Sequence, residues 1–117
     1  MSANHSSFKF SANQVYQVMK PYQLTPEQEA AVQEASVNSP TLVVAGAGSG
    51  KTELMAVRVL WLVANGFARP DQILGLTFTR KAASELGKRV YESLLKLRDS
   101  EMWPEDLDYD FKPPTIS

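Results

Sequence analysis

The chain has 117 residues, 44% of them hydrophobic and 21% charged, which predicts one soluble globular domain with a modest core. Its formal net charge of −1 argues against a generally basic nucleic-acid binder, and the absence of cysteine excludes a disulfide framework and a thiolate metal site. No apolar run is long enough to cross a membrane, and the first ten residues lack the apolar core of a signal peptide. We therefore expect a cytoplasmic protein that does not contact a membrane.

The N-terminal residues are small and polar. We expect residues 1–20 to form a partly disordered N-terminal extension, with mobile residues up to about 12 and a short helix over residues 11–20. His5 has no second histidine, cysteine or carboxylate pair beside it, so we interpret it as a solvated residue rather than a metal ligand. The main domain is expected over residues 21–117.

A helix start follows in the segment YQLTPEQEAAVQE. Thr25 is the expected N-cap, Pro26 suits the first helical position, and Gln28 completes a Thr-x-x-Gln capping box. Ala31 and Val32 are expected to face the core. Gln28 has a second possible role, because an amide can donate one hydrogen bond and accept another, which matches the N7 and N6 edge of adenine. The residues by themselves leave both roles open.

The segment TLVVAGAGSGKT, residues 41–52, predicts a buried strand, a glycine-rich turn and the start of a helix. Glycines let several backbone N–H groups converge on one anion, and the helix N-terminus adds unpaired donors and its positive dipole end. Lys51 would reach the outer phosphates of a nucleotide and the Thr52 hydroxyl would ligate Mg²⁺. The other reading is a loop with no ligand. The expected phosphate-binding residues are Ala45, Gly46, Ala47, Gly48, Ser49, Gly50, Lys51 and Thr52.

The helix predicted over residues 50–64 is apolar on nearly every side and is therefore expected to be buried under several neighbours. Gly66 suits the left-handed position that ends it. A second buried strand is expected over residues 73–78, which completes a strand–helix–strand unit with a parallel sheet. In such sheets ligands gather outside the carboxyl ends of the strands, so residues 79–81 and the glycine-rich turn should share one edge.

The C-terminal third is divided by charge. Residues 80–98 hold six basic and two acidic residues, and an amphipathic helix is predicted over residues 81–97, whose charged face is either solvated or serves a polyanion. Residues 99–110 hold six acidic residues and no basic one, so we expect there a loop or short helix pinned by aromatics, without DNA contact. Residues 115–117 resemble the beginning of a strand.

Three segments resemble motifs of superfamily 1 helicases of the UvrD/Rep/PcrA group. AGAGSGKT is similar to motif I, in which alanine commonly stands first, and LTPEQEAAV is similar to the Q motif, in which the glutamine, here Gln28, reads adenine. LTFTRKAASEL is similar to motif Ia, whose loop touches single-stranded DNA. Glu53 departs from the pattern, because many members carry a basic residue there. The resemblance implies that Lys51 and Thr52 act in ATP hydrolysis.

The motif Ia residues have side chains that suit single-stranded DNA. Phe78 can stack on a base, Thr79 can donate a hydrogen bond to a phosphate, and Arg80 and Lys81 add positive charge. Phe78 is equally well explained as a core residue that closes the strand. The resemblance to motif Ia assigns Phe78, Thr79, Arg80 and Lys81 to DNA binding.

ATP hydrolysis also requires a carboxylate pair at the end of another hydrophobic strand and arginines from a second domain, and neither follows here. We therefore expect an incomplete α/β, P-loop NTPase (RecA-like) fold with helices flanking a parallel sheet, in the N-terminal part of an ATP-dependent DNA helicase. The cofactors implied are ATP and Mg²⁺. The partners implied are single-stranded DNA or duplex ends, a second motor lobe and, more weakly, a second helicase–nuclease subunit. The alternatives are a stand-alone P-loop nucleotide-binding module and an unrelated P-loop ATPase or kinase.

Overall fold

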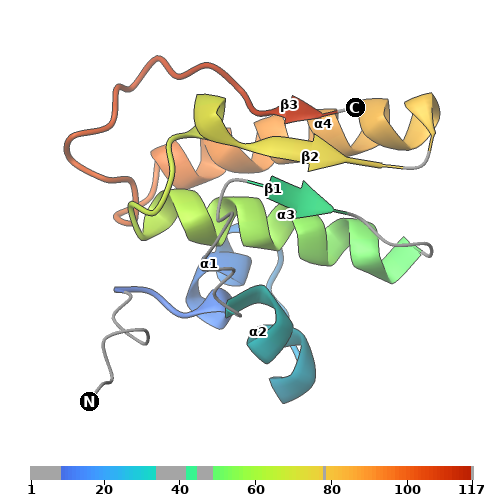
Figure 1. The fold of residues 1–117 in the computed structure, drawn as a ribbon. Helices are drawn as coiled ribbons and strands as arrows, with labels where there is room; N and C mark the ends of the chain where they lie inside the picture. Colours follow the sequence, from blue (N-terminus) through green and yellow to red (C-terminus); the bar gives the residue numbers. More distant parts are fainter. Residues whose placement is uncertain (1–8, 34–41, 45–48, 78, 117) are drawn as a thin grey trace.

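The computed structural model describes residues 9–33, 42–44, 49–77 and 79–116, without the side chains of residues 42–44, 49–52 and 76. Figure 1 shows helices packed together beside a small sheet. The elements in chain order are α1 (Ala12–Met19), α2 (Pro26–Gln33), β1 (Leu42–Val44), α3 (Ser49–Ala64), the 3₁₀ helix η2 (Pro70–Gln72), β2 (Leu74–Leu76), α4 (Arg80–Arg98) and β3 (Thr115–Ile116).

The described strands form one parallel sheet in the order β1-β2-β3. Each connection is a crossover through a helix, α3 between β1 and β2 and α4 between β2 and β3 (Figure 1). The predicted α/β class with a parallel sheet is confirmed. The segment expected to begin a strand at residue 115 does so, as β3 pairs with β2.

Gly75 in the middle strand shows which face of the sheet the helices cover. A Cβ atom on this glycine would lie 3.1 Å from Met55 Cε of α3 and 2.6 Å from Ile116 Cδ1 of β3. Ile116 in turn lies 3.9 Å from the Cβ position of Gly87 on α4. Helices α3 and α4 therefore cover the same face. Leu74 points to the opposite face, because side chains alternate along a strand, and it is 40% exposed.

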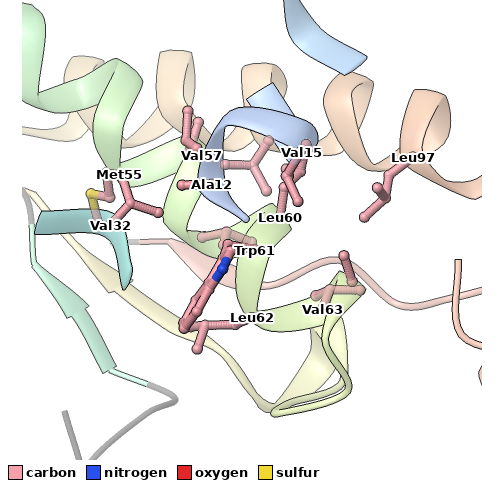
Figure 2. Close-up of a cluster of buried hydrophobic side chains, with 14 of the residues drawn as sticks. Ala12, Val15, Val32, Met55, Val57, Leu60, Trp61, Leu62, Val63 and Leu97 are labelled. Atoms are coloured by element: carbon pink, nitrogen blue, oxygen red, sulfur yellow. The ribbon is translucent and has the colours of Figure 1, made fainter. Parts of the chain in front are cut away.

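Helix α3 is the centre of the core, as its all-round apolar sequence predicts. Its described residues from Met55 to Ala64 are all buried except Arg58, and Figure 2 shows Val57, Leu60 and Trp61 directed toward neighbouring elements. The helix contacts α1, α2, α4 and β1. Because α3 packs against other elements on every side, its sequence has no need of a polar stripe facing solvent.

The C-terminus of α3 forms a Schellman motif around Gly66, which has a φ of 75°. The amide of Gly66 donates to the carbonyl of Val63 (3.1 Å), and the amide of Phe67 donates to the carbonyl of Leu62 (2.9 Å). This confirms the predicted helix end. The predicted helix limits elsewhere agree with the structure to within about one or two residues.

The N-terminal helices pack on α3 and each begins with a capping box. In α1 the Ser11 hydroxyl accepts from the Gln14 amide, and the Gln14 side chain accepts from the Ser11 amide. Helix α1 buries Ala12, Val15 and Tyr16, so the described part of the predicted extension contributes to the core. In α2 only Val32 is buried.

The expectation that Ala31 faces the core is wrong, because Ala31 is exposed. Helix α2 lies on α3 along the face that carries Val32, and the Arg58 guanidinium of α3 donates to the Val32 carbonyl (2.7 Å). Small alanine side chains give little direction to an eight-residue helix. The orientation of α2 is instead determined by Val32 and by contacts to α1.

Helix α4 is amphipathic as predicted, with Leu86, Val90, Leu94 and Leu97 buried. The acidic segment after it forms turns without a further helix, and Trp103 and Phe111 pack together with ring centroids 5.3 Å apart. The expectation that aromatic side chains hold this segment in place is therefore confirmed. Within the described residues, no helix has the length and apolarity needed to span a bilayer.

Candidate functional site

The N-termini of α3 and α4 lie at one edge of the sheet. Strands β1 and β2 are parallel, with Val44 paired to Leu76, so both strands end at the same edge. Helix α3 begins five residues after Val44, and α4 begins four residues after Leu76 (Figure 1). The segments predicted to hold a nucleotide and DNA therefore both follow strands at the carboxyl edge, where ligands of open α/β sheets bind.

The predicted phosphate loop is described only in part. Ala45, Gly46, Ala47 and Gly48 lie outside the described residues. The backbone of residues 49–52 forms the first turn of α3, which begins at Ser49, one residue before the expected Gly50. This turn contains no acidic residue, so the positive end of the helix dipole is not offset within it. The phosphate and Mg²⁺ contacts assigned to the Lys51 and Thr52 side chains stay predictions.

Gln28 forms the capping box that the sequence predicts. The backbone N–H of Thr25 donates to Gln28 Oε1 (2.9 Å), and the backbone N–H of Gln28 donates to Thr25 Oγ1 (3.1 Å). The structural role of Gln28 is therefore confirmed. The adenine-reading role stays a prediction that is chemically compatible with the cap, because an amide oxygen has a second lone pair and the side-chain NH₂ group is a separate donor.

The motif Ia segment begins α4. Thr79 is the N-cap, and its Oγ1 accepts from the Ala82 amide (3.0 Å), while the Thr77 hydroxyl donates to the Thr79 carbonyl (3.0 Å). Arg80 and Lys81 are exposed, and neither makes an ion pair with another described residue. Phe78 lies outside the described residues, so its choice between base stacking and core packing stays open. The two cations have the exposure that a phosphate contact requires.

Sequence reasoning missed a polar cluster around Glu53, the residue that follows Thr52. Its carboxylate accepts hydrogen bonds from Tyr16 Oη (2.6 Å), Lys20 Nζ (2.7 Å) and Arg89 Nη1 (3.0 Å). The bonds from Lys20 and Tyr16 lower the pKa of the Glu53 carboxyl group below its ordinary value, against a smaller raising effect of burial. Burial, followed by the bond to Glu53, raises the pKa of the Tyr16 phenol to about 12.

Two signals in the sequence point toward this cluster. Glu53 is the single acidic residue of α3, and a lone carboxylate on a helix buried on all sides needs partners. Tyr16 and Lys20 are four residues apart, which places them on one face of a helix. The contribution of Arg89 has no local signal, because it comes from a helix 36 positions further along the chain.

Comparison with known proteins agrees with the geometry. The sequence model of the UvrD/REP helicase N-terminal domain matches residues 24–111. The chain belongs to the UvrD/REP helicase N-terminal domain family. The match covers helices α2, α3 and α4 in one continuous stretch.

Several curated proteins are similar to this UvrD/REP domain. DNA helicase IV of Escherichia coli (strain K12) is 49% identical over 71 residues, which are 61% of this chain and 10% of that protein. ATP-dependent DNA helicase UvrD1 of Mycobacterium leprae (44% identical) and ATP-dependent DNA helicase PcrA of Bacillus subtilis (42%) each match over 80 residues, 68% of this chain. The chain spans about a tenth of the length of these relatives.

Proposed function

We propose that this chain is the ATP-binding N-terminal part of an ATP-dependent DNA helicase that translocates on single-stranded DNA in DNA repair or recombination. The observation that carries the proposal is the position of α3 and α4, whose N-termini meet the same edge of a parallel sheet. Family membership over residues 24–111 supports it, and relatives in this family are named ATP-dependent DNA helicases. The sheet would then be the beginning of a P-loop, RecA-like fold.

In this proposal residues 45–52 hold the phosphates of ATP. The N–H groups at the start of α3 have no intrahelical partners and favour an anion, Lys51 adds a positive charge, and the Thr52 hydroxyl is the expected Mg²⁺ ligand. Gln28 reads the adenine edge. Mg²⁺ supplies charge neutralisation on the phosphates when bound. The carboxylates and arginines that complete hydrolysis would come from elsewhere in the full-length protein, so this chain alone is not expected to turn over.

The DNA would lie at the start of α4. Thr79, Arg80 and Lys81 would contact the phosphate backbone, and Phe78 would lie beside a base. The proposed partners are single-stranded DNA and duplex ends, and the second motor lobe. A second helicase–nuclease subunit is also proposed, because the segment TELMAVRVLWLVANG, residues 52–66, resembles the motor subunit of such enzymes. We place the protein in the cytoplasm.

Titration of the full-length protein with a fluorescent ATP analogue tests the nucleotide site. We expect Lys51→Ala to weaken binding at least roughly tenfold, because a charge-assisted bond to phosphate is removed. The matched control is Lys96→Ala, which removes the same charge from an exposed position in the last turn of α4. Equal affinities of the wild type and Lys51→Ala would refute the site.

A stand-alone nucleotide-binding module is the second candidate function. Family membership counts against an unrelated P-loop ATPase or kinase, since neither class accounts for the motif Ia segment. The two candidates, the nucleotide-binding module and the helicase motor, differ in whether they hydrolyse ATP. DNA-stimulated ATP hydrolysis by the full-length protein, lost in Lys51→Ala, would support the motor, and nucleotide binding without hydrolysis would support the module.

A further inference from the structure

The carboxylate of Glu53 joins three helices at one point. Tyr16 lies in α1 and Lys20 is the C-cap residue that follows it, Arg89 comes from the middle of α4, and Glu53 itself lies in α3 directly after its first turn. The three donors share the two carboxylate oxygens: Tyr16 binds Oε2, and Lys20 and Arg89 bind Oε1. The Glu53 side chain is 25% exposed, so water screens these interactions only in part.

The burial of Tyr16 gives this junction one donor that is held in place by the core. The residue is only 5% exposed, and its ring is part of the hydrophobic core together with Ala12 and Val15. A phenol held by packing and directed at a carboxylate at 2.6 Å leaves the Glu53 side chain little freedom. The two cations alone would not do this, because both are about half exposed.

The position of Glu53 would otherwise be unfavourable for nucleotide binding. It follows the residues proposed to hold phosphates by a single position, so an uncompensated carboxylate there would repel a triphosphate. Lys20 and Arg89 offset that charge, and their bonds direct the carboxylate toward α1 and α4. The cluster therefore offsets the negative charge of Glu53 directly after the first turn of α3.

We propose that Glu53 is a positioning residue for the phosphate loop, held by Tyr16, Lys20 and Arg89 so that the first turn of α3 is fixed before nucleotide binds. This inference rests on the proposed nucleotide site. In the proposed site, Glu53 contacts no atom of the nucleotide. The three donors fix Glu53, Glu53 fixes the backbone of residues 49–52, and that backbone presents its N–H groups and Lys51 to the phosphates.

Two variants that conserve net charge test the positioning role in the full-length protein. Tyr16→Phe removes one hydroxyl and keeps the buried ring. Glu53→Asp keeps the charge but shortens the side chain by one methylene, so the carboxylate no longer reaches all three donors. The matched controls are Tyr91→Phe and Glu92→Asp, which make the same changes at exposed positions of α4.

The measurement is the Kd of a fluorescent ATP analogue, at a temperature well below the unfolding midpoint of every variant. We expect Tyr16→Phe and Glu53→Asp each to raise the Kd roughly fivefold and the controls to leave it unchanged, since a first turn that is no longer held must be ordered when the nucleotide binds. The KM for ATP should rise in parallel. A purely structural role would instead reduce the fraction of folded protein, which lowers the apparent kcat and leaves the KM unchanged.

Lys51→Ala in the same series separates the two proposals. If Lys51→Ala abolishes binding while Tyr16→Phe or Glu53→Asp binds as tightly as the wild type, the positioning role is refuted and the nucleotide site stands. If Lys51→Ala binds as tightly as the wild type, the nucleotide site is refuted and the positioning role is refuted with it. Weakened binding in both charge-conserving variants, with unchanged controls, supports the inference.

Discussion

Helices α3 and α4 start at the same edge of the sheet but are built in opposite ways. Helix α3 is buried along almost its whole described length, between the sheet and helices α1, α2 and α4. Helix α4 buries a single face and exposes Arg80 and Lys81 in its first turn. A helix enclosed on all sides suits a site that must keep its geometry, whereas a half-exposed helix presents charges to a long polyanion. Behind the same edge, therefore, one helix is enclosed from Met55 onward and the other begins with two exposed cations.

The largest predicted effect comes from the enclosed helix. Leu60→Ala should lower the free energy of unfolding by about 3 kcal/mol, because Leu60 is fully buried and its removal leaves a cavity among the neighbours of α3. Leu95→Ala on the half-buried part of α4 is the matched control and should cost about 1 kcal/mol. Calorimetry of the domain transition measures both. Equal losses would contradict the contrast between the helices.

A smaller effect is expected at the accessible helix end. The double variant Arg80→Ala, Lys81→Ala should weaken single-stranded DNA binding about tenfold at low salt and reduce the salt dependence, by roughly 0.7 in slope for each phosphate that is no longer neutralised. The matched double variant Lys88→Ala, Lys96→Ala removes the same charge from the same helix. Fluorescence anisotropy at several salt concentrations distinguishes them, and an identical weakening in both would show only a non-specific charge effect.

The smallest effect is on the pH dependence of stability. The pKa of Tyr16 is raised from 10.0 to about 12, so its stabilising contribution is complete below pH 10 and is lost as the pH rises through 12. The pKa of Glu53 is lowered from 4.5, so its contribution is present above pH 4.5 and is lost as the pH falls through the lowered pKa. Tyr16→Phe should therefore flatten the alkaline fall of the melting midpoint, and Glu53→Gln the acidic fall.

Tyr91→Phe is the control for the alkaline limb, because Tyr91 is an exposed tyrosine on α4. Its alkaline profile should match that of the wild type. A Tyr16→Phe profile that coincides with the wild type between pH 10 and 12 would show that the fold does not stabilise the protonated form of the Tyr16 hydroxyl.

Features controlled by neighbouring residues were predictable from the sequence. The capping box of Thr25 and Gln28 needs only four consecutive residues, and the left-handed Gly66 needs only a helix end. The parallel sheet followed from two short apolar runs separated by a helix of the right length. The placement of α3 and α4 at one edge then follows from strand direction, so the outline of the candidate site needed no long-range information.

Features made by distant contacts were not predictable. Ala31 and Val32 were both expected to face the core, and the packing of α2 on α3 buries only Val32. Glu53 was interpreted only as a departure from a family pattern, because its partners come from 33, 36 and 37 positions away in the chain. Arg89 belongs to the charged face of α4, for which the sequence left open a solvated role and a polyanion-binding role, and its guanidinium group reaches Glu53 of α3.

Leu74 lies on the sheet face that α3 and α4 leave open, with 40% of its surface in contact with solvent. Parallel strands are apolar on both sides and occur in proteins with both sides covered. The exposed Leu74, with Thr115 beside it in register on β3, therefore marks the face of the sheet on which a covering layer would pack.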